Sequence, residues 1–181
     1  MPADQRRSMI VAATLPLLLE HGDRVTTRQI AEAAGVAEGT IFRAFTDKDE
    51  VIVAVVEAAL DPAPLDRALD QIDPALDLEA ALAAAIEIMQ RRIIDIWQLV
   101  SKLGARYHDT TRRRVADAEA LVRIFASHRE RITEPPATGA RLLRALTLAA
   151  THPTLVDTPL SPSEIVELFL HGVGVATEGR A

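Results

Sequence analysis

The chain of 181 residues contains no cysteine, so it has neither disulfide bridges nor thiolate metal sites, as is usual in a reducing cytoplasm. Its five histidines show no H-E-x-x-H-like spacing, and we expect no metal and no cofactor. No apolar run reaches the roughly 20 residues that a membrane-spanning helix needs. The sequence therefore predicts a cytoplasmic protein without a membrane segment.

Catalytic motifs are missing as well. No nucleophile, base and orienting residue stand at a recognisable spacing, and no glycine-rich loop could cradle a phosphate, so we expect no enzyme activity. A hydrophobic content of 49% is enough for a core. Apolar residues recur with helical periodicity and without a convincing alternating strand. These patterns predict an all-α fold.

The segment from Thr26 to Phe45 carries the signals of two short helices joined at a glycine. Thr26 and Gln29 have the spacing of a capping box, in which each side chain accepts a hydrogen bond from the other residue's backbone amide. The first helix should therefore begin at Thr27. Gly35 supplies the left-handed conformation that ends such a helix.

A second helix is expected to begin after Ala37. Ala37 has no side-chain oxygen to cap it, which costs roughly 1 kcal/mol. Ile41 and Phe45 lie four residues apart and should be buried together. The opposite side would expose Gly39, Thr40 and Arg43. Two such helices form a helix-turn-helix, a common device for reading DNA.

This motif resembles the N-terminal domain of the tetracycline-repressor (TetR) family of transcriptional regulators. The family pattern TT-x-x-x-IA-x-x-AGV-x-x-GT, followed by two large apolar residues, a Phe and a Lys, matches from about Ile10 to Val51. Two positions depart from it: Phe42 replaces a frequent tyrosine that binds phosphate, and Ala44 replaces a frequent histidine. Both changes remove polar contacts with DNA.

The resemblance implies that the exposed side of the two helices binds a double-stranded DNA operator. The implied contacts are Thr40 and Glu38 with bases, Arg43 with guanine or phosphate, Thr27, Arg28 and Lys48 with phosphate, and Phe42 with a thymine methyl or sugar; Ala37 and Gly39 belong to the same DNA-binding set. Residues 1–50 contain six Lys or Arg against eight Asp or Glu. We therefore expect low non-specific affinity and a dependence on dimerisation.

The proline- and aspartate-rich segment 61–77 is the expected junction between two parts of the chain. We expect an N-terminal three-helix DNA-binding domain of residues 1–50 and a C-terminal helical bundle of residues 51–181. The first helix should cover about residues 5–20, with Pro16 bending it or shifting its boundary. Later helices are expected at about 47–60, 78–103, 110–131, 137–151 and 163–175.

The resemblance further implies that the bundle binds an unidentified small-molecule effector and forms a homodimer. Large polarisable side chains are the candidates for the ligand pocket, although they could simply fill the core: Met89, Trp97, Tyr107 and Phe125. The last two helices carry more apolar surface than one buried face needs, and Gly172 and Gly174 would let them approach a second copy closely. Candidates for the dimer interface are Leu142, Leu146, Ile165, Phe169, Gly172 and Val173, and the alternative is that they pack only within one chain.

Together these features predict a ligand-responsive DNA-binding transcriptional regulator, with repression of a palindromic operator by a homodimer as the expected mode. The effector would change the separation of two DNA-binding domains through the fourth helix. The alternative is a helical small-molecule-binding or interaction protein with weak or lost DNA affinity. The excess of acidic residues in residues 1–50 and the missing Tyr and His contacts support that alternative.

Overall fold

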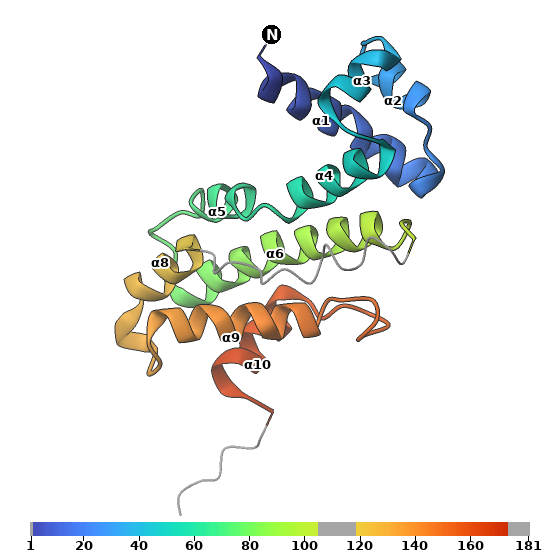
Figure 1. Ribbon diagram of the computed structural model, residues 1–181. Helices are drawn as coiled ribbons and strands as arrows, with labels where there is room; N and C mark the ends of the chain where they lie inside the picture. Colours follow the sequence, from blue (N-terminus) through green and yellow to red (C-terminus); the bar gives the residue numbers. More distant parts are fainter. Residues whose placement is uncertain (1, 105–118, 174–181) are drawn as a thin grey trace, which may run out of the picture. The chain divides into compact units, whose positions relative to one another are not determined.

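The computed structural model describes residues 2–104 and 119–173, in which helices are joined by turns and loops without any strand (Figure 1). The predicted all-α fold is confirmed. The described residues form two compact units. The first holds the residues up to Asp61 together with 95–104, and the second holds 62–94 together with 119–173. The functional boundary expected after residue 50 stays a prediction.

The first unit consists of four α-helices, a 3-10 turn and the end of a fifth α-helix. Its elements are α1 (Ala3–His21), η1 (Gly22–Arg24), α2 (Thr27–Ala33), α3 (Glu38–Ala44), α4 (Lys48–Leu60) and the last turns of α6 (Leu78–Val100). Helix α1 packs against α2, α3 and α4, and it continues through Pro16. Side chains that are 0% exposed form the centre of the core: Ile10, Leu18, Val25, Ile30, Ile41, Val51 and Ile52.

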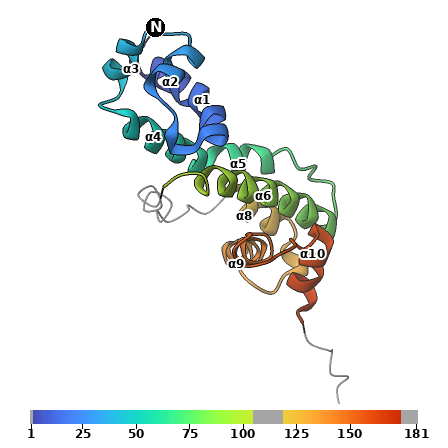
Figure 2. The same cartoon turned by 90° about the vertical axis from the view of Figure 1, so that its right-hand side faces the viewer.

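The second unit contains α5, the rest of α6 and the described helices after it (Figure 2). Its elements besides α6 are α5 (Ala63–Leu69), α8 (Glu119–Ser127), η3 (Arg129–Arg131), α9 (Pro136–Ala149) and α10 (Pro162–His171). Phe125 is fully buried, and its ring meets the ring of Phe169 edge-on at a centroid distance of 5.7 Å. Gly139 makes room for Phe125, because a Cβ atom there would lie 2.6 Å from the ring.

The last helix is shorter than predicted. Helix α10 ends at His171, whereas the sequence predicts a helix to Val175. Gly172 has a φ of 75°, and its amide donates to the carbonyl of Leu168 at 2.9 Å, so it terminates the helix. The expectation that Gly172 lies within the helix is therefore wrong, and its role in letting a second copy approach stays a prediction. Gly174, for which the sequence predicts the same role, lies outside the described residues.

No helix in the described ranges combines the length and apolar character needed to cross a membrane.

Candidate DNA-binding surface

The turn between α2 and α3 is built as the sequence predicts. The Thr26 hydroxyl accepts from the amide of Gln29 at 3.2 Å, and the Gln29 side chain accepts from the amide of Thr26 at 2.8 Å. At the other end of α2, the amide of Val36 donates to the carbonyl of Ala31 at 3.0 Å, and Gly35 has a φ of 64°. This pair of features is a Schellman termination, which fixes where α3 begins.

Helix α3 has one buried and one exposed side. Ile41 is 0% and Phe45 2% exposed, so they anchor the helix in the core. On the other side Phe42 is 53% exposed, and Arg43 is exposed without a hydrogen bond or ion pair to any described residue. The exposed members of the predicted DNA surface on and before this helix are Ala37, Glu38, Gly39, Phe42 and Arg43, and Thr40 is half-buried.

The N-terminus of α3 lacks a side-chain cap, as the alanine at its N-cap position predicts. Ala37 makes no side-chain hydrogen bond there. The first residue of the helix is instead linked to α2, because the hydroxyl of Thr27 donates to Oε1 of Glu38 at 2.5 Å. A hydroxyl has a single proton. Thr27 therefore cannot donate to a DNA phosphate while it donates to Glu38.

Two cations of the predicted DNA surface have intramolecular partners. Arg28 pairs with Glu32 on the same helix at 3.1 Å, and both side chains are mostly exposed. The ammonium of Lys48 donates to the backbone carbonyl of Asp23 at 2.6 Å. An ammonium has three donors, so this bond leaves Lys48 able to bind a phosphate.

Arg7 of α1 contacts the end of α3, a role that was not predicted. Its Nη1 donates to the carbonyl of Ala44 at 2.7 Å, and its Nη2 pairs with Oε1 of Glu50 at 2.7 Å. Its guanidinium carbon also lies 4.1 Å from the centroid of the Phe45 ring. No sequence signal links Arg7 with Glu50, because they are 43 positions apart.

Glu50 lies in the first turn of α4 and accepts hydrogen bonds from two directions. Its second oxygen, Oε2, accepts from the backbone amide of Thr46 at 2.6 Å. That bond, followed by the bond from Arg7, lowers the pKa of Glu50 to about 2. Asp47 caps the same helix by accepting from the amide of Glu50 at 2.8 Å.

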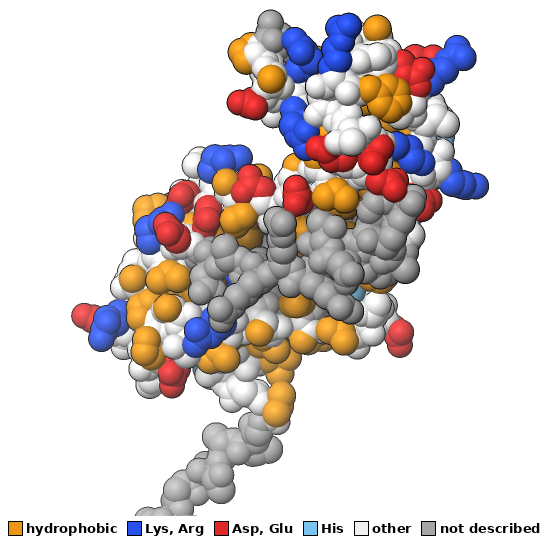
Figure 3. Space-filling model, in the orientation of Figure 1, with side chains coloured by type: hydrophobic (Ala, Val, Ile, Leu, Met, Phe, Trp, Pro, Cys, Tyr) orange, Lys and Arg blue, Asp and Glu red, His pale blue; other side chains and the backbone are white. Residues whose placement is uncertain are grey.

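Charges of both signs are interspersed on the first unit. In the view of Figure 3, basic and acidic side chains lie next to one another near its exposed helices, without a continuous basic patch. This distribution agrees with the balance of six basic and eight acidic residues in residues 1–50. Affinity for phosphates must therefore come from a few well-placed cations.

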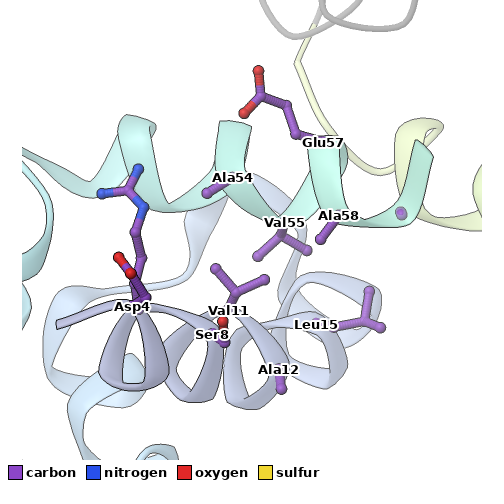
Figure 4. A pocket seen from close by; sticks show the side chains of 11 residues that line it. Asp4, Ser8, Val11, Ala12, Leu15, Ala54, Val55, Glu57 and Ala58 are labelled. Atoms are coloured by element: carbon purple, nitrogen blue, oxygen red, sulfur yellow. The ribbon is translucent and has the colours of Figure 1, made fainter. Parts of the chain in front are cut away.

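A groove of about 550 Å³ lies between α1 and α4 of the first unit (Figure 4). Val11, Leu15 and Val55 give it an apolar floor, and Asp4 and Glu57 add carboxylates. None of the residues predicted to line a ligand pocket borders it. None of the predicted DNA contacts borders it either.

The predicted pocket residues lie in different places. Met89 and Phe125 are buried in the core of the second unit. Trp97 is half-buried on the part of α6 that belongs to the first unit, and Tyr107 lies outside the described residues. Within the described ranges, no group of three or more His, Cys, Asp or Glu side chains could hold a metal ion.

The predicted interface residues differ in exposure. Ile165 is fully buried in its own chain, and Leu146 and Phe169 pack partly buried against the same core. Leu142 is 50% and Val173 92% exposed, and Gly172 is exposed as well. Helix α9 also exposes Leu148, at 45%. The large apolar side chains that are exposed in the described part of the second unit are thus Leu142 and Leu148 on α9, Leu155 after α9 and Val173 after α10.

Comparison with known proteins gives consistent matches. The model of the family described as bacterial regulatory proteins, tetR family, matches residues 10–55. A protein from Streptomyces coelicolor described as a transcriptional regulator shares 27% identity, with 91% of this chain and 96% of that chain covered and a TM-score of 0.57.

Two further solved structures share the fold at lower identity. A transcriptional regulator of the TetR/AcrR family from Thermobifida fusca is 21% identical, with 94% of this chain and 100% of that chain covered and a TM-score of 0.62. The TetR-like regulator LfrR from Mycobacterium smegmatis, in complex with proflavine, is 20% identical, with 95% and 99% covered and a TM-score of 0.54.

Proposed function

We propose that this chain, which belongs to the tetR family of bacterial regulatory proteins, is a ligand-responsive DNA-binding regulator that represses transcription as a homodimer. Its target would be a two-fold symmetric operator, because a two-fold symmetric dimer presents two copies of α3 to successive major grooves. We place the DNA contacts in residues 1–50 and ligand binding and dimerisation in residues 51–181. Such a regulator acts in the cytoplasm.

The exposed side of α3 is the observation that carries this proposal. Phe42 is 53% exposed although Ile41 and Phe45, its neighbours on the helix, are buried. An exposed aromatic ring of this kind can contact the methyl group of thymine in a major groove. Arg43 stands beside it without an intramolecular partner among the described residues, and its guanidinium can bind guanine or a phosphate.

The proposed effector is a small molecule that binds within residues 51–181. Its candidate contacts are the large polarisable side chains Met89, Trp97, Tyr107 and Phe125. The related LfrR holds proflavine, which supports a ligand-binding role for this fold. Helix α4 and the last turns of α6 would transmit binding, since Leu99 is buried in the core that also contains Val55 of α4. A coupling of about 1 to 3 kcal/mol would change operator occupancy roughly 5- to 150-fold.

Selection of bound DNA from a random pool, followed by mobility-shift titration, tests the proposal. We expect a palindromic or nearly palindromic consensus. Arg43→Ala should weaken binding to it at least tenfold, about 1.4 kcal/mol, and leave dimerisation unchanged. Arg67→Ala on α5, another exposed arginine, is the matched control and should bind normally. A wild-type chain that selects no sequence would instead support the alternative of an interaction protein without DNA affinity.

A further inference from the structure

A single ion pair holds three consecutive residues from the end of α3 towards α4, namely Ala44, Phe45 and Thr46. The guanidinium of Arg7 binds the carbonyl of Ala44 and covers the ring of Phe45, and the carboxylate of Glu50 binds the amide of Thr46. Arg7 and Glu50 also bind each other at 2.7 Å. The chain segment that follows α3 is therefore fixed by one residue from α1 and one from α4.

Each bond satisfies a group that the helix geometry leaves open. The carbonyl of Ala44 is one of the last carbonyls of α3, which have no partner within the helix. The amide of Thr46 lies just before the N-cap of α4, so it has no partner in that helix either. Both bonds involve charged groups, which bind more strongly and with more defined geometry than neutral pairs.

Maintaining the fold does not by itself require this ion pair. The side chains of Arg7 and Glu50 are 41% and 35% exposed, and ion pairs with such exposure contribute little to stability. The fully buried side chains around Ile41 and Ile52 already hold the unit together. What the ion pair adds is a fixed direction for the C-terminal end of α3, where Arg43 projects.

We infer that Arg7, together with Glu50, is a positioning residue for sequence-specific DNA binding: it holds the C-terminal end of α3 in the orientation that lets Phe42 and Arg43 reach the bases. This inference rests on the proposed DNA-binding function. Arg7 uses two of its five N–H donors on Ala44 and Glu50, and the role inferred for it is to orient α3 rather than to bind a phosphate.

Glu50→Gln separates positioning from simple electrostatics. Removal of a negative charge near DNA strengthens binding if only charge matters. If Glu50 positions α3, the same change weakens binding to the selected operator, by about 2- to 30-fold. Arg7→Lys keeps the positive charge but loses the planar, two-pronged contact, and it should weaken binding to a similar extent.

The experiment measures operator affinity at several salt concentrations, with the melting temperature of each variant. The slope of log K against log salt should stay at the wild-type value in Arg7→Gln, because no phosphate contact is lost. A slope smaller by about 0.9 per subunit, or about 1.8 for the dimer, would make Arg7 a phosphate contact and overturn the inference. The double variant Arg7→Gln/Glu50→Gln should lose about as much affinity as either single variant, and not the sum of the two losses, if both residues act through one ion pair.

A control variant in the second unit shows whether loss of any exposed ion pair affects DNA binding, and the two possible negative results have different meanings. The exposed pair of Arg91 with Glu87 at 2.9 Å is a comparable ion pair in the second unit, and Arg91→Gln should leave operator binding unchanged. If the wild-type chain binds its operator and the variants Glu50→Gln and Arg7→Lys bind it with the same affinity, the inference is overturned while the proposed function stands. Absence of sequence-selective binding by the wild-type chain would overturn the proposed function and this inference with it.

Discussion

Gly22 and Lys102 approach so closely that a Cβ atom on Gly22 would collide with the carbonyl oxygen of Lys102. Gly22 follows α1, and Lys102 follows the last turn of α6. The ammonium of Lys102 also donates to the carbonyl of Leu19 at the end of α1. With Leu103 buried in the same core, these contacts attach the end of α6 to the first unit.

Substitution of Gly22 should therefore destabilise the protein more than substitution of Gly35 or Gly39. Gly22→Ala introduces the clash and also strains a φ of 61°, and we expect a loss of at least about 2 kcal/mol. Gly35→Ala strains a φ of 64° but meets nothing within 4 Å, so about 1 kcal/mol should be lost. Gly39→Ala, with neither problem, should stabilise α3 by about 0.5 to 1 kcal/mol. Denaturant unfolding measures all three, and equal losses at Gly22 and Gly35 would show that Lys102 does not confine Gly22.

Replacement of Glu38 should alter DNA binding in two opposite ways. Glu38→Gln removes a negative charge from the exposed side of α3, so non-specific DNA affinity should rise about threefold at low salt and not at high salt. If the carboxylate accepts from the amino group of a cytosine, discrimination at one operator position should fall by about 1 to 3 kcal/mol.

Glu167→Gln, an exposed carboxylate of α10 in the second unit, is the control for charge alone. It should change neither non-specific affinity nor base preference. Titrations with the selected operator and with single-base variants of it measure both effects of Glu38→Gln. Unchanged preference at every base pair would remove Glu38 from the set of base contacts.

The bonds to Glu50 predict a loss of stability in acid. The folded-state pKa of about 2 lies below the ordinary value of 4.5, so the carboxylate stabilises the folded protein at pH values above that ordinary value. This contribution should decline as the pH falls from about 5 towards 2. The melting temperatures of the wild type and Glu50→Gln, measured across this range, should therefore converge at low pH. A difference in melting temperature that stays constant across this pH range would contradict the lowered pKa of Glu50.

The exposed face of α9 predicts how the proposed homodimer is held together. Leu142 is 50% exposed, and Leu142→Asp would place a charge in any interface that covers it, so we expect dissociation to monomers. Leu155→Asp is the control, because Leu155 is 63% exposed but lies between α9 and α10. Analytical ultracentrifugation distinguishes the two. A stable dimer of Leu142→Asp would move the interface away from this face.

The sequence alone determined the features of this protein that depend on neighbouring residues. The capping box of Thr26 with Gln29 and the termination of α2 at Gly35 are set by hydrogen bonds within a few residues, so spacing was enough to predict them. Burial of Ile41 and Phe45 followed from helical periodicity in the same way.

Only the tertiary structure decided which distant groups meet. Arg7 with Glu50, Thr27 with Glu38 and Gly22 with Lys102 are pairs whose partners are brought together by packing of different helices. Helical periodicity marks a face as apolar without saying what covers it, and so Ile165, predicted for a dimer interface, is buried in its own chain. A local pattern specifies a helix and its ends, whereas the partner of a side chain depends on how the helices pack.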